Sequence, residues 1–246
     1  MVFLYLFFIG ACIGSFLNVL IDRLPNKETI FGRSHCDFCR KKIPWYDLIP
    51  LASFIFLRGY TRCCRKKLSF FYPLVEGLTG LFFVAVYVFI PTQTSIEKFA
   101  LFGVISCLIV IFFADAKYTI IPDEILIACA IFSLPFFLQN PRDHLVSAVA
   151  LYLFFQIIHS LSKGHAMGFG DVKFAGVIGF LQGFKVGVLS VYLAFLIGGL
   201  IGMVLVGVHQ KKMKSKIAFG PFLVMGILIT LFFEKELFLL IDQWFF

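Results

Sequence analysis

Two aspartates stand at positions suited to acid–base chemistry. Asp115 ends one apolar segment, and Asp171 precedes another in the run Gly168-Phe169-Gly170-Asp171. A carboxylate at the end of an apolar helix is costly to desolvate, which makes it a functional candidate. Two carboxylates a few ångströms apart share a proton, so one can activate a water while the other protonates an oxyanion. The glycines beside Asp171 leave room for an extended backbone. Asp115 and Asp171 are therefore the candidate catalytic pair.

Neighbouring charges allow a second interpretation. Lys117 and Lys173 each lie two residues after one of these aspartates, so the two acids can instead be neutralised charges at helix ends. The spacing does not separate these interpretations. Asp123 follows Pro122, and a proline with an acidic residue favours a helix start. We rank Asp123 below the pair and assign supporting roles to Gly168, Gly170, Lys173 and Asp123.

Four cysteines form a second group with chemical potential. Cys36 and Cys39 form a Cys-x-x-Cys pair, and Cys63 and Cys64 are adjacent. In a reducing cytoplasm two such pairs favour a zinc site over disulfides. Four thiolates around zinc would fold a segment too small to build its own core. Adjacent cysteines seldom both reach one metal, so free thiols or partial ligation stay open as the alternative.

The elements that position these residues are those of a membrane protein. The 246 residues are 60% hydrophobic and 15% charged, whereas soluble domains are about 45–50% apolar and about 25% charged. Eleven basic and three acidic residues lie between Arg23 and Lys67, and they account for the whole net charge of +8. Short loops rich in Lys and Arg stay in the cytoplasm. The charge thus indicates orientation and contact with membrane lipids, and no nucleic-acid partner.

We expect an all-α polytopic membrane protein of about eight transmembrane helices, with a small cysteine-containing insert in the cytoplasm. The expected domains are a first helix at 1–22, a basic insert at 23–72 and a membrane core at 73–246. Seven spans with a re-entrant segment are the alternative, because the sixth apolar segment is short and only a Gly-containing turn near Lys185 separates it from the seventh. The predicted spans are 3–20, 73–90, 99–114, 125–138, 145–161, 174–184, 186–208 and 219–240.

Orientation follows from the charges around the first span. No basic residue precedes it, so we expect the N-terminus outside and the insert inside. Counting spans from there places Asp115 and Asp171 at the same cytoplasmic depth. It also places the basic run at 209–216 inside, although that run was not used to set the orientation.

Several motifs in this order resemble the type IV prepilin peptidases, and the resemblance extends over nearly the whole chain. They comprise the opening at 10–25, Cys36-x-x-Cys39 with Asp47-Leu-Ile-Pro50, Gly59, the run at 69–80, Asp115 with Ile121-Pro-Asp123, Gly168-Phe-Gly-Asp171, and Ala218-Phe-Gly-Pro221. One position departs from the family pattern: Thr61 stands where the first cysteine of a second Cys-x-x-Cys is usual.

The resemblance implies an aspartyl endopeptidase of the bacterial cytoplasmic membrane. Such an enzyme cleaves the basic leader of type IV prepilins or pseudopilins after a Gly, and many members then methylate the new N-terminus with S-adenosylmethionine. It implies that Asp115 and Asp171 are catalytic without a cofactor and that Gly59 and Glu76 serve methyl transfer. A peptidase without methyltransferase activity is one alternative. A proton- or cation-coupled transporter is another, although its carboxylates would be expected near the bilayer midplane.

Overall fold

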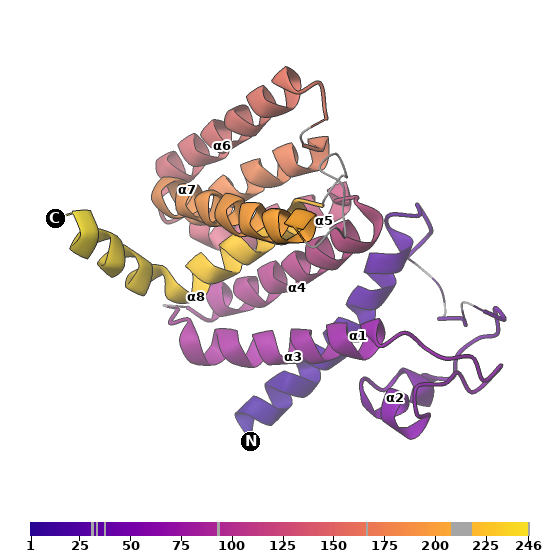
Figure 1. Cartoon of the computed structure of the whole chain (residues 1–246). Coiled ribbons are helices and arrows are strands. Elements are labelled where there is room, and N and C mark those ends of the chain that lie inside the picture. The colour runs from indigo at the N-terminus through magenta and orange to yellow at the C-terminus, as the bar shows by residue number, and fades with distance from the viewer. Residues whose placement is uncertain are drawn as a thin grey trace. The chain divides into compact units, whose positions relative to one another are not determined.

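The computed structural model describes residues 1–30, 32, 34–36, 38–92, 94–165, 167–207 and 218–245. These residues form helices and two isolated β-bridges, with no strand among them (Figure 1). The all-α prediction is therefore confirmed. The predicted cytoplasmic run at 209–216 lies outside the described residues. The chain divides into two compact units, Met1–Pro91 and Thr92–Phe246.

In the first unit two helices cross closely. Helix α1 (Val2–Arg23) packs against α3 (Phe71–Phe89), as Figure 1 shows. Cβ atoms added at Gly10 and Gly14 would each lie 2.8 Å from the α3 backbone. Small residues four apart let apolar helices approach in this way where lipid supplies no hydrophobic driving force. The opening motif of the chain therefore builds the α1–α3 contact.

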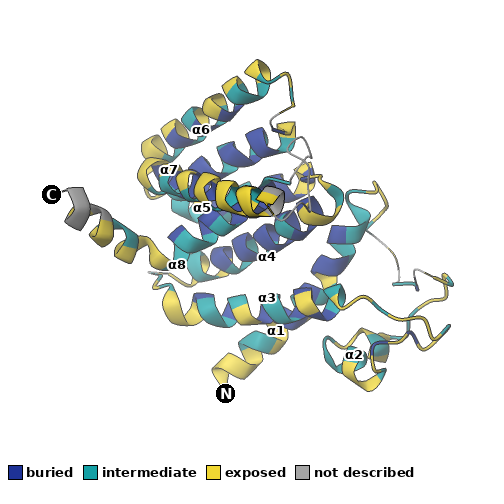
Figure 2. Cartoon of the chain, viewed as in Figure 1, coloured by how far each residue is buried: buried dark blue, intermediate teal, exposed yellow. Residues whose placement is uncertain are grey.

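The insert between these helices has little regular structure. It holds the 3₁₀ helix η1 (Trp45–Leu48) and the short helix α2 (Ala52–Phe56), neither of which has a buried residue (Figure 2). Two antiparallel β-bridges close loops at 35–42 and 60–67. Polar contacts, more than an apolar core, must therefore hold the insert.

The second unit is a helical bundle built around α4. Much of α4 is buried, as the colouring in Figure 2 shows. Twelve of its 24 residues are buried, and the last of these is Asp115. α4 contacts α5 and α8, and α7 contacts α5, α6 and α8. The helices of this unit are α4 (Ser95–Tyr118), α5 (Asp123–Phe137), α6 (Pro141–Leu161), α7 (Phe169–Gly207) and α8 (Gly220–Phe245).

Helix α7 is broken at Gly183, where φ is 71°. A Cβ added at Gly187 would lie 3.6 Å from the Gly179 Cα, so the two halves run back beside each other. Helix α6 satisfies the backbone at the break, because Asp143 accepts a hydrogen bond from the Phe184 amide at 3.0 Å and Ser147 donates one to the Gly183 carbonyl at 2.9 Å. The predicted Gly-containing turn exists, two residues before Lys185.

Among the described residues, five helices are long and apolar enough to cross a membrane, which agrees with a polytopic membrane protein. The predicted count of eight spans stays a prediction. The five helices include the broken α7 only once, and they do not include α5, which has 15 residues, or α8, which is broken at Phe233. The five are Val2–Arg23, Phe71–Phe89, Ser95–Tyr118, Pro141–Leu161 and Phe169–Val204.

Candidate active site and cysteine cluster

Asp115 lies near the end of α4 with only 5% of its surface exposed. Its Oδ2 atom accepts a hydrogen bond from the backbone amide of Gly220 at 2.8 Å. Gly220 is the first residue of α8, so its amide is one of the donors that a helix start leaves without an intrahelical partner. A Cβ at position 220 would lie 2.7 Å from that same oxygen. Only glycine therefore fits beside Asp115 without displacing it.

Asp171 is the third residue of α7 and is 7% exposed. Its Oδ2 atom accepts a hydrogen bond from the Gly168 amide at 3.2 Å, which is half of a capping box at the helix start. Its Oδ1 atom is buried and has no hydrogen-bond partner among the described residues. Buried polar atoms are nearly always satisfied, so this oxygen requires an explanation such as a bound water or a substrate.

Asp115 and Asp171 lie close enough for a Coulomb interaction between their carboxyl groups. The loop after α4 touches the start of α7: a Cβ added at Gly170 would lie 3.2 Å from Ile121. Glycine at 170 therefore allows the two carboxylate-bearing elements to approach. A buried pair of this kind can share one proton between its members.

Lys173 has a different partner from the one weighed from the sequence. Its Nζ lies 2.7 Å from an Asp123 oxygen, and this ion pair joins α7 to α5. Lys173 therefore binds Asp123 and not Asp171. The side chains of Lys173 and Asp123 are both exposed, and an exposed ion pair contributes about 0–1 kcal/mol to stability.

Gly220 is the site residue that sequence reasoning missed. It lies in the motif Ala218-Phe-Gly-Pro221, which resembles the family, but the sequence alone indicates no role for it. A Gly-Pro pair at the start of an apolar helix is a local signal for free amide donors. The partner of those donors lies 105 residues earlier, and nothing in the local pattern identifies it.

The four candidate zinc ligands come together in the first unit. All four Sγ atoms lie within 4.8 Å of one another, with Cys39 and Cys63 at 3.2 Å and Cys36 and Cys64 at 3.8 Å. Zinc–sulfur bonds of about 2.3 Å in a tetrahedron place sulfur atoms about 3.8 Å apart. The geometry and chemistry of this donor set therefore fit a zinc ion, adjacent cysteines included.

Two similar turns carry these thiols. The loops at 35–42 and 60–67 are each closed by one β-bridge between their first and last residues. Each also has an arginine with positive φ at the equivalent place, Arg40 at 56° and Arg65 at 51°. The second loop thus keeps the backbone of the first even though its sequence lacks the second Cys-x-x-Cys.

Thr61 occupies the place that Cys36 has in the first loop. Their amides donate to equivalent carbonyls, at 2.9 Å for Cys36 and 2.8 Å for Thr61. The Thr61 hydroxyl lies 3.1 Å from the Cys64 sulfur. Cys63, one residue before Cys64, supplies the fourth thiol that Thr61 does not.

Hydrogen bonding shifts the pKa values of the adjacent thiols of Cys63 and Cys64 in opposite directions. The Thr61 hydroxyl lowers the pKa of Cys64 to about 7. The hydrogen bond with Cys39 raises the pKa of Cys63 to about 12. Since metals bind the thiolate, Cys64 is the better prepared of these two ligands at neutral pH.

Glu76 is buried at the junction of α1, α3 and the insert. It hydrogen-bonds with the Ser15 side chain, and its Oε2 accepts from the Leu51 amide at 2.8 Å. Leu51 has φ 59° and ψ −45°, and the Ala52 amide donates to the Pro50 carbonyl at 2.5 Å, as in a rare and strained γ-turn. Glu76 therefore holds a conformation that would otherwise cost about 1–3 kcal/mol.

The other residue assigned to methyl transfer lies on the same segment. Gly59 has φ 75° and packs on Phe54, a residue of α2. Glu76 holds the start of α2 and Gly59 follows its end, so α2 connects them. Asn18 lies near this junction on α1 and donates to the Tyr72 carbonyl at 3.1 Å, and its buried Oδ1 has no hydrogen-bond partner among the residues that the structure describes.

Comparison with known proteins identifies the chain. The bacterial peptidase A24 N-terminal domain matches residues 8–90, and the type IV leader peptidase family matches residues 102–203. A Bacillus subtilis protein named prepilin leader peptidase/N-methyltransferase is 32% identical and covers 92% of this chain and 92% of its own length. The chain belongs to the type IV leader peptidase family.

Other family members are also named prepilin leader peptidase/N-methyltransferase. One from Klebsiella pneumoniae is 34% identical over 74% of this chain and 85% of its own, and one from Pectobacterium carotovorum is 31% identical over 89% and 88%. No solved structure matches. The two family models divide where the units divide: the N-terminal domain covers the cysteines and Glu76, and the leader peptidase model covers both aspartates.

Proposed function

We propose that the chain is a membrane aspartyl endopeptidase that removes the leader of type IV prepilins or pseudopilins after a Gly. Asp115 and Asp171 are the catalytic pair. The observation that carries this proposal is the buried Oδ1 of Asp171, which has no hydrogen-bond partner in the described part of the chain and belongs to a carboxylate within electrostatic range of another. A structural charge at a helix end has no need of such an arrangement.

In this mechanism one carboxyl group of the pair acts as the base and the other acts as the acid. One carboxylate takes a proton from the attacking water, and the protonated partner gives its proton to the carbonyl oxygen of the scissile bond. When the tetrahedral intermediate collapses, the C–N bond breaks, the carboxyl group that took the proton of the water gives it to the leaving amine, and a hydroxyl proton of the intermediate returns to the partner carboxylate. The Gly220 and Gly168 amides fix one oxygen of each aspartate. The unpartnered Asp171 Oδ1 then remains to hold the water or the substrate.

We place the reaction at the cytoplasmic face of the bacterial inner membrane, with the N-terminus outside. The basic insert supports this orientation through the positive-inside rule. The partner would be a prepilin whose apolar segment lies in the bilayer and whose leader lies in the cytoplasm. The scissile bond would then meet the ends of α4 and α7, which carry the two aspartates.

We infer that the first unit, Met1–Pro91, adds a methyl group from S-adenosylmethionine to the new N-terminus, with the insert at 23–72 and the α3 residue Glu76 as its methyltransferase-associated part. The two aspartates of the second unit then form the peptidase core. The residues at the α1–α3 junction fit a cationic cofactor, because Glu76 is a buried carboxylate and Asn18 Oδ1 is a buried acceptor that no other described residue satisfies. Bound there, the cofactor supplies an activated methyl group. Glu76 and Asn18 would hold its positive groups.

We assign the cysteine cluster to a structural zinc ion held by Cys36, Cys39, Cys63 and Cys64. The insert has no buried residue in η1 or α2, so it lacks a core of its own. A zinc ion would join its two loops, because metal binding supplies folding free energy to small domains of this kind.

Co-expression with a pilin-like precursor tests the central proposal. Wild type should convert the precursor to a faster-migrating band on a gel. Asp115→Asn and Asp171→Asn should leave the precursor uncut while the membrane protein accumulates normally. Cleavage by either variant at the wild-type rate contradicts the assignment of the pair.

A further inference from the structure

The insert carries an apolar surface that proteolysis and methyl transfer leave unexplained. Its principal members are Trp45 at 77%, Ile55 at 71% and Phe56 at 85% exposed, and Tyr46 and Ile49 are also exposed. These residues belong to η1, α2 and the link between them, in a part of the chain expected to lie outside the membrane. Contiguous exposed aromatic and aliphatic groups mark an interaction site.

The fold keeps these side chains outward. Phe54 of α2 is half-buried, because it contacts Phe70 at a ring separation of 6.2 Å and lies against Gly59. Ile55 and Phe56 follow it and remain exposed. The outward face is therefore separate from the face by which α2 is attached.

The attachment of α2 sets its depth along a membrane-spanning helix. The Leu51 amide, one residue before α2, binds Glu76, the sixth residue of α3. At 1.5 Å per residue, Glu76 lies about 7 Å along α3 from its start. Interfacial helices rest about 5–10 Å into the headgroup and acyl boundary. With the start of α3 taken as the edge of its candidate span, α2 is attached at a comparable depth.

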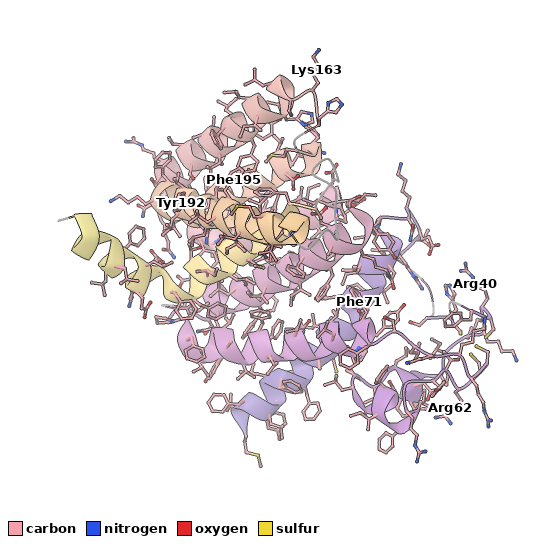
Figure 3. All side chains as sticks on the ribbon, viewed as in Figure 1. Arg40, Arg62, Phe71, Lys163, Tyr192 and Phe195 are labelled. Carbon is pink, nitrogen blue, oxygen red and sulfur yellow. The ribbon has the colours of Figure 1, made fainter. Side chains whose placement is uncertain are left out.

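The charge around this surface selects the partner. Arg58, Arg65 and Lys67 are exposed. Arg62, which Figure 3 labels, is neutralised by Asp47 in an ion pair of 2.9 Å and lies over the Tyr46 ring. A basic border around aromatic groups complements anionic headgroups. The same border repels the basic leader expected of a prepilin.

We propose that the exposed face of η1 and α2 is an interfacial anchor that inserts into the leaflet beside the insert, with a bilayer containing anionic lipid as its partner. Trp45 and Phe56 enter the headgroup and acyl boundary. The exposed arginines and lysines contact lipid phosphates. The anchor holds the insert, with Glu76 and the cysteine cluster, against the membrane surface.

The fluorescence of Trp45 can report whether this surface contacts lipid, because the chain has only one other tryptophan, Trp244. The full chain with Trp244→Phe is reconstituted in vesicles of phosphatidylglycerol and phosphatidylcholine, with and without brominated acyl chains. Brominated lipid should lower Trp45 emission about twofold or more, and aqueous iodide should have little effect. Strong iodide quenching with no effect of brominated lipid overturns the proposal.

A matched probe on the cysteine loops serves as control. Phe38 is also exposed, lies in the loop at 35–42 and has the Lys66 ammonium 5.1 Å from its ring. The chain with Trp45→Phe, Trp244→Phe and Phe38→Trp should be quenched by iodide and not by brominated lipid. Equal quenching of both probes by brominated lipid overturns the assignment to η1 and α2.

The lipid charge and the competing occupant are tested in the same system. Without phosphatidylglycerol, quenching of Trp45 by brominated lipid should weaken, and unchanged quenching removes the role of the basic border. Protection of Trp45 from iodide by an added prepilin, in vesicles where brominated lipid has no effect, assigns the surface to the substrate and overturns the proposal.

Discussion

Backbone amides at helix starts hold the candidate catalytic carboxylates of the second unit, whereas turns hold the polar groups of the first. Asp115 binds the start of α8 and Asp171 the start of its own helix. In the first unit, the thiols lie on two loops and Glu76 binds a strained turn at Leu51. A helix start inside a bundle is fixed because the whole helix packs against its neighbours. Turns in an insert without a core depend on a metal, a carboxylate or a membrane surface.

The largest expected effect separates the two units by chemistry. Asp115→Asn or Asp171→Asn should lower leader cleavage on the order of 10³-fold or more, because acid–base catalysis contributes about 10²–10⁴-fold. Methylation of an already processed pilin should continue. The measurement is labelled methyl transfer from S-adenosylmethionine beside a cleavage assay. Parallel loss of both activities contradicts the division into units.

The converse change is Glu76→Gln. It removes the buried charge near Asn18 and weakens the bond to the Leu51 amide. Methyl transfer should fall about 10²-fold, since a displacement of about 1 Å costs that much, while cleavage stays within about twofold. Glu28→Gln, in the exposed part of the insert, is the matched control and should change neither activity.

Gly220→Ala tests whether the start of α8 positions Asp115. The new Cβ would lie 2.7 Å from Oδ2, so the carboxylate or α8 must move, and kcat for cleavage should fall about 10- to 100-fold. Gly199→Ala is the control, because a Cβ there meets nothing within 4 Å. Equal activity of the two variants, with both proteins stable in the membrane, rules out positioning by α8.

Cys63→Ser tests how the insert compensates for Thr61. Loss of one of four thiolates should lower zinc affinity at least about tenfold, measured as metal per purified chain. Adding Thr61→Cys in the same chain should restore the zinc, since position 61 has the backbone of position 36. Cys12→Ser, outside the cluster, should keep full zinc. Full zinc in the Cys63→Ser chain shows that Cys63 is not a ligand.

The smallest effect is expected at the rim of the second unit. Lys173→Gln breaks the ion pair with Asp123 but leaves both catalytic carboxylates and their amide donors in place. An exposed pair contributes about 0–1 kcal/mol, so cleavage should fall less than about fivefold. A loss as large as that of Asp171→Asn would move Lys173 from a supporting role into catalysis.

The sequence predicted the class of fold and the candidate residues from local signals. Apolar runs of the length of a bilayer predicted the helices, and each of the eight predicted segments falls on a helix apart from one or two terminal residues. Four cysteines and two aspartates were candidates on residue type and spacing alone. The sequence pattern also located the turn in α7 to within two residues, because glycines interrupt the apolar run there.

Composition and the lengths of the apolar runs therefore determined that this is a helical membrane protein whose net positive charge lies in one insert. Only the tertiary structure decided that Gly220 holds Asp115, that Lys173 binds Asp123, and that Cys63 joins a cluster from which Thr61 is missing. Each of these contacts joins elements that are separate in the sequence. A local pattern records which face of a helix is apolar, but not which distant amide or thiol that helix will meet.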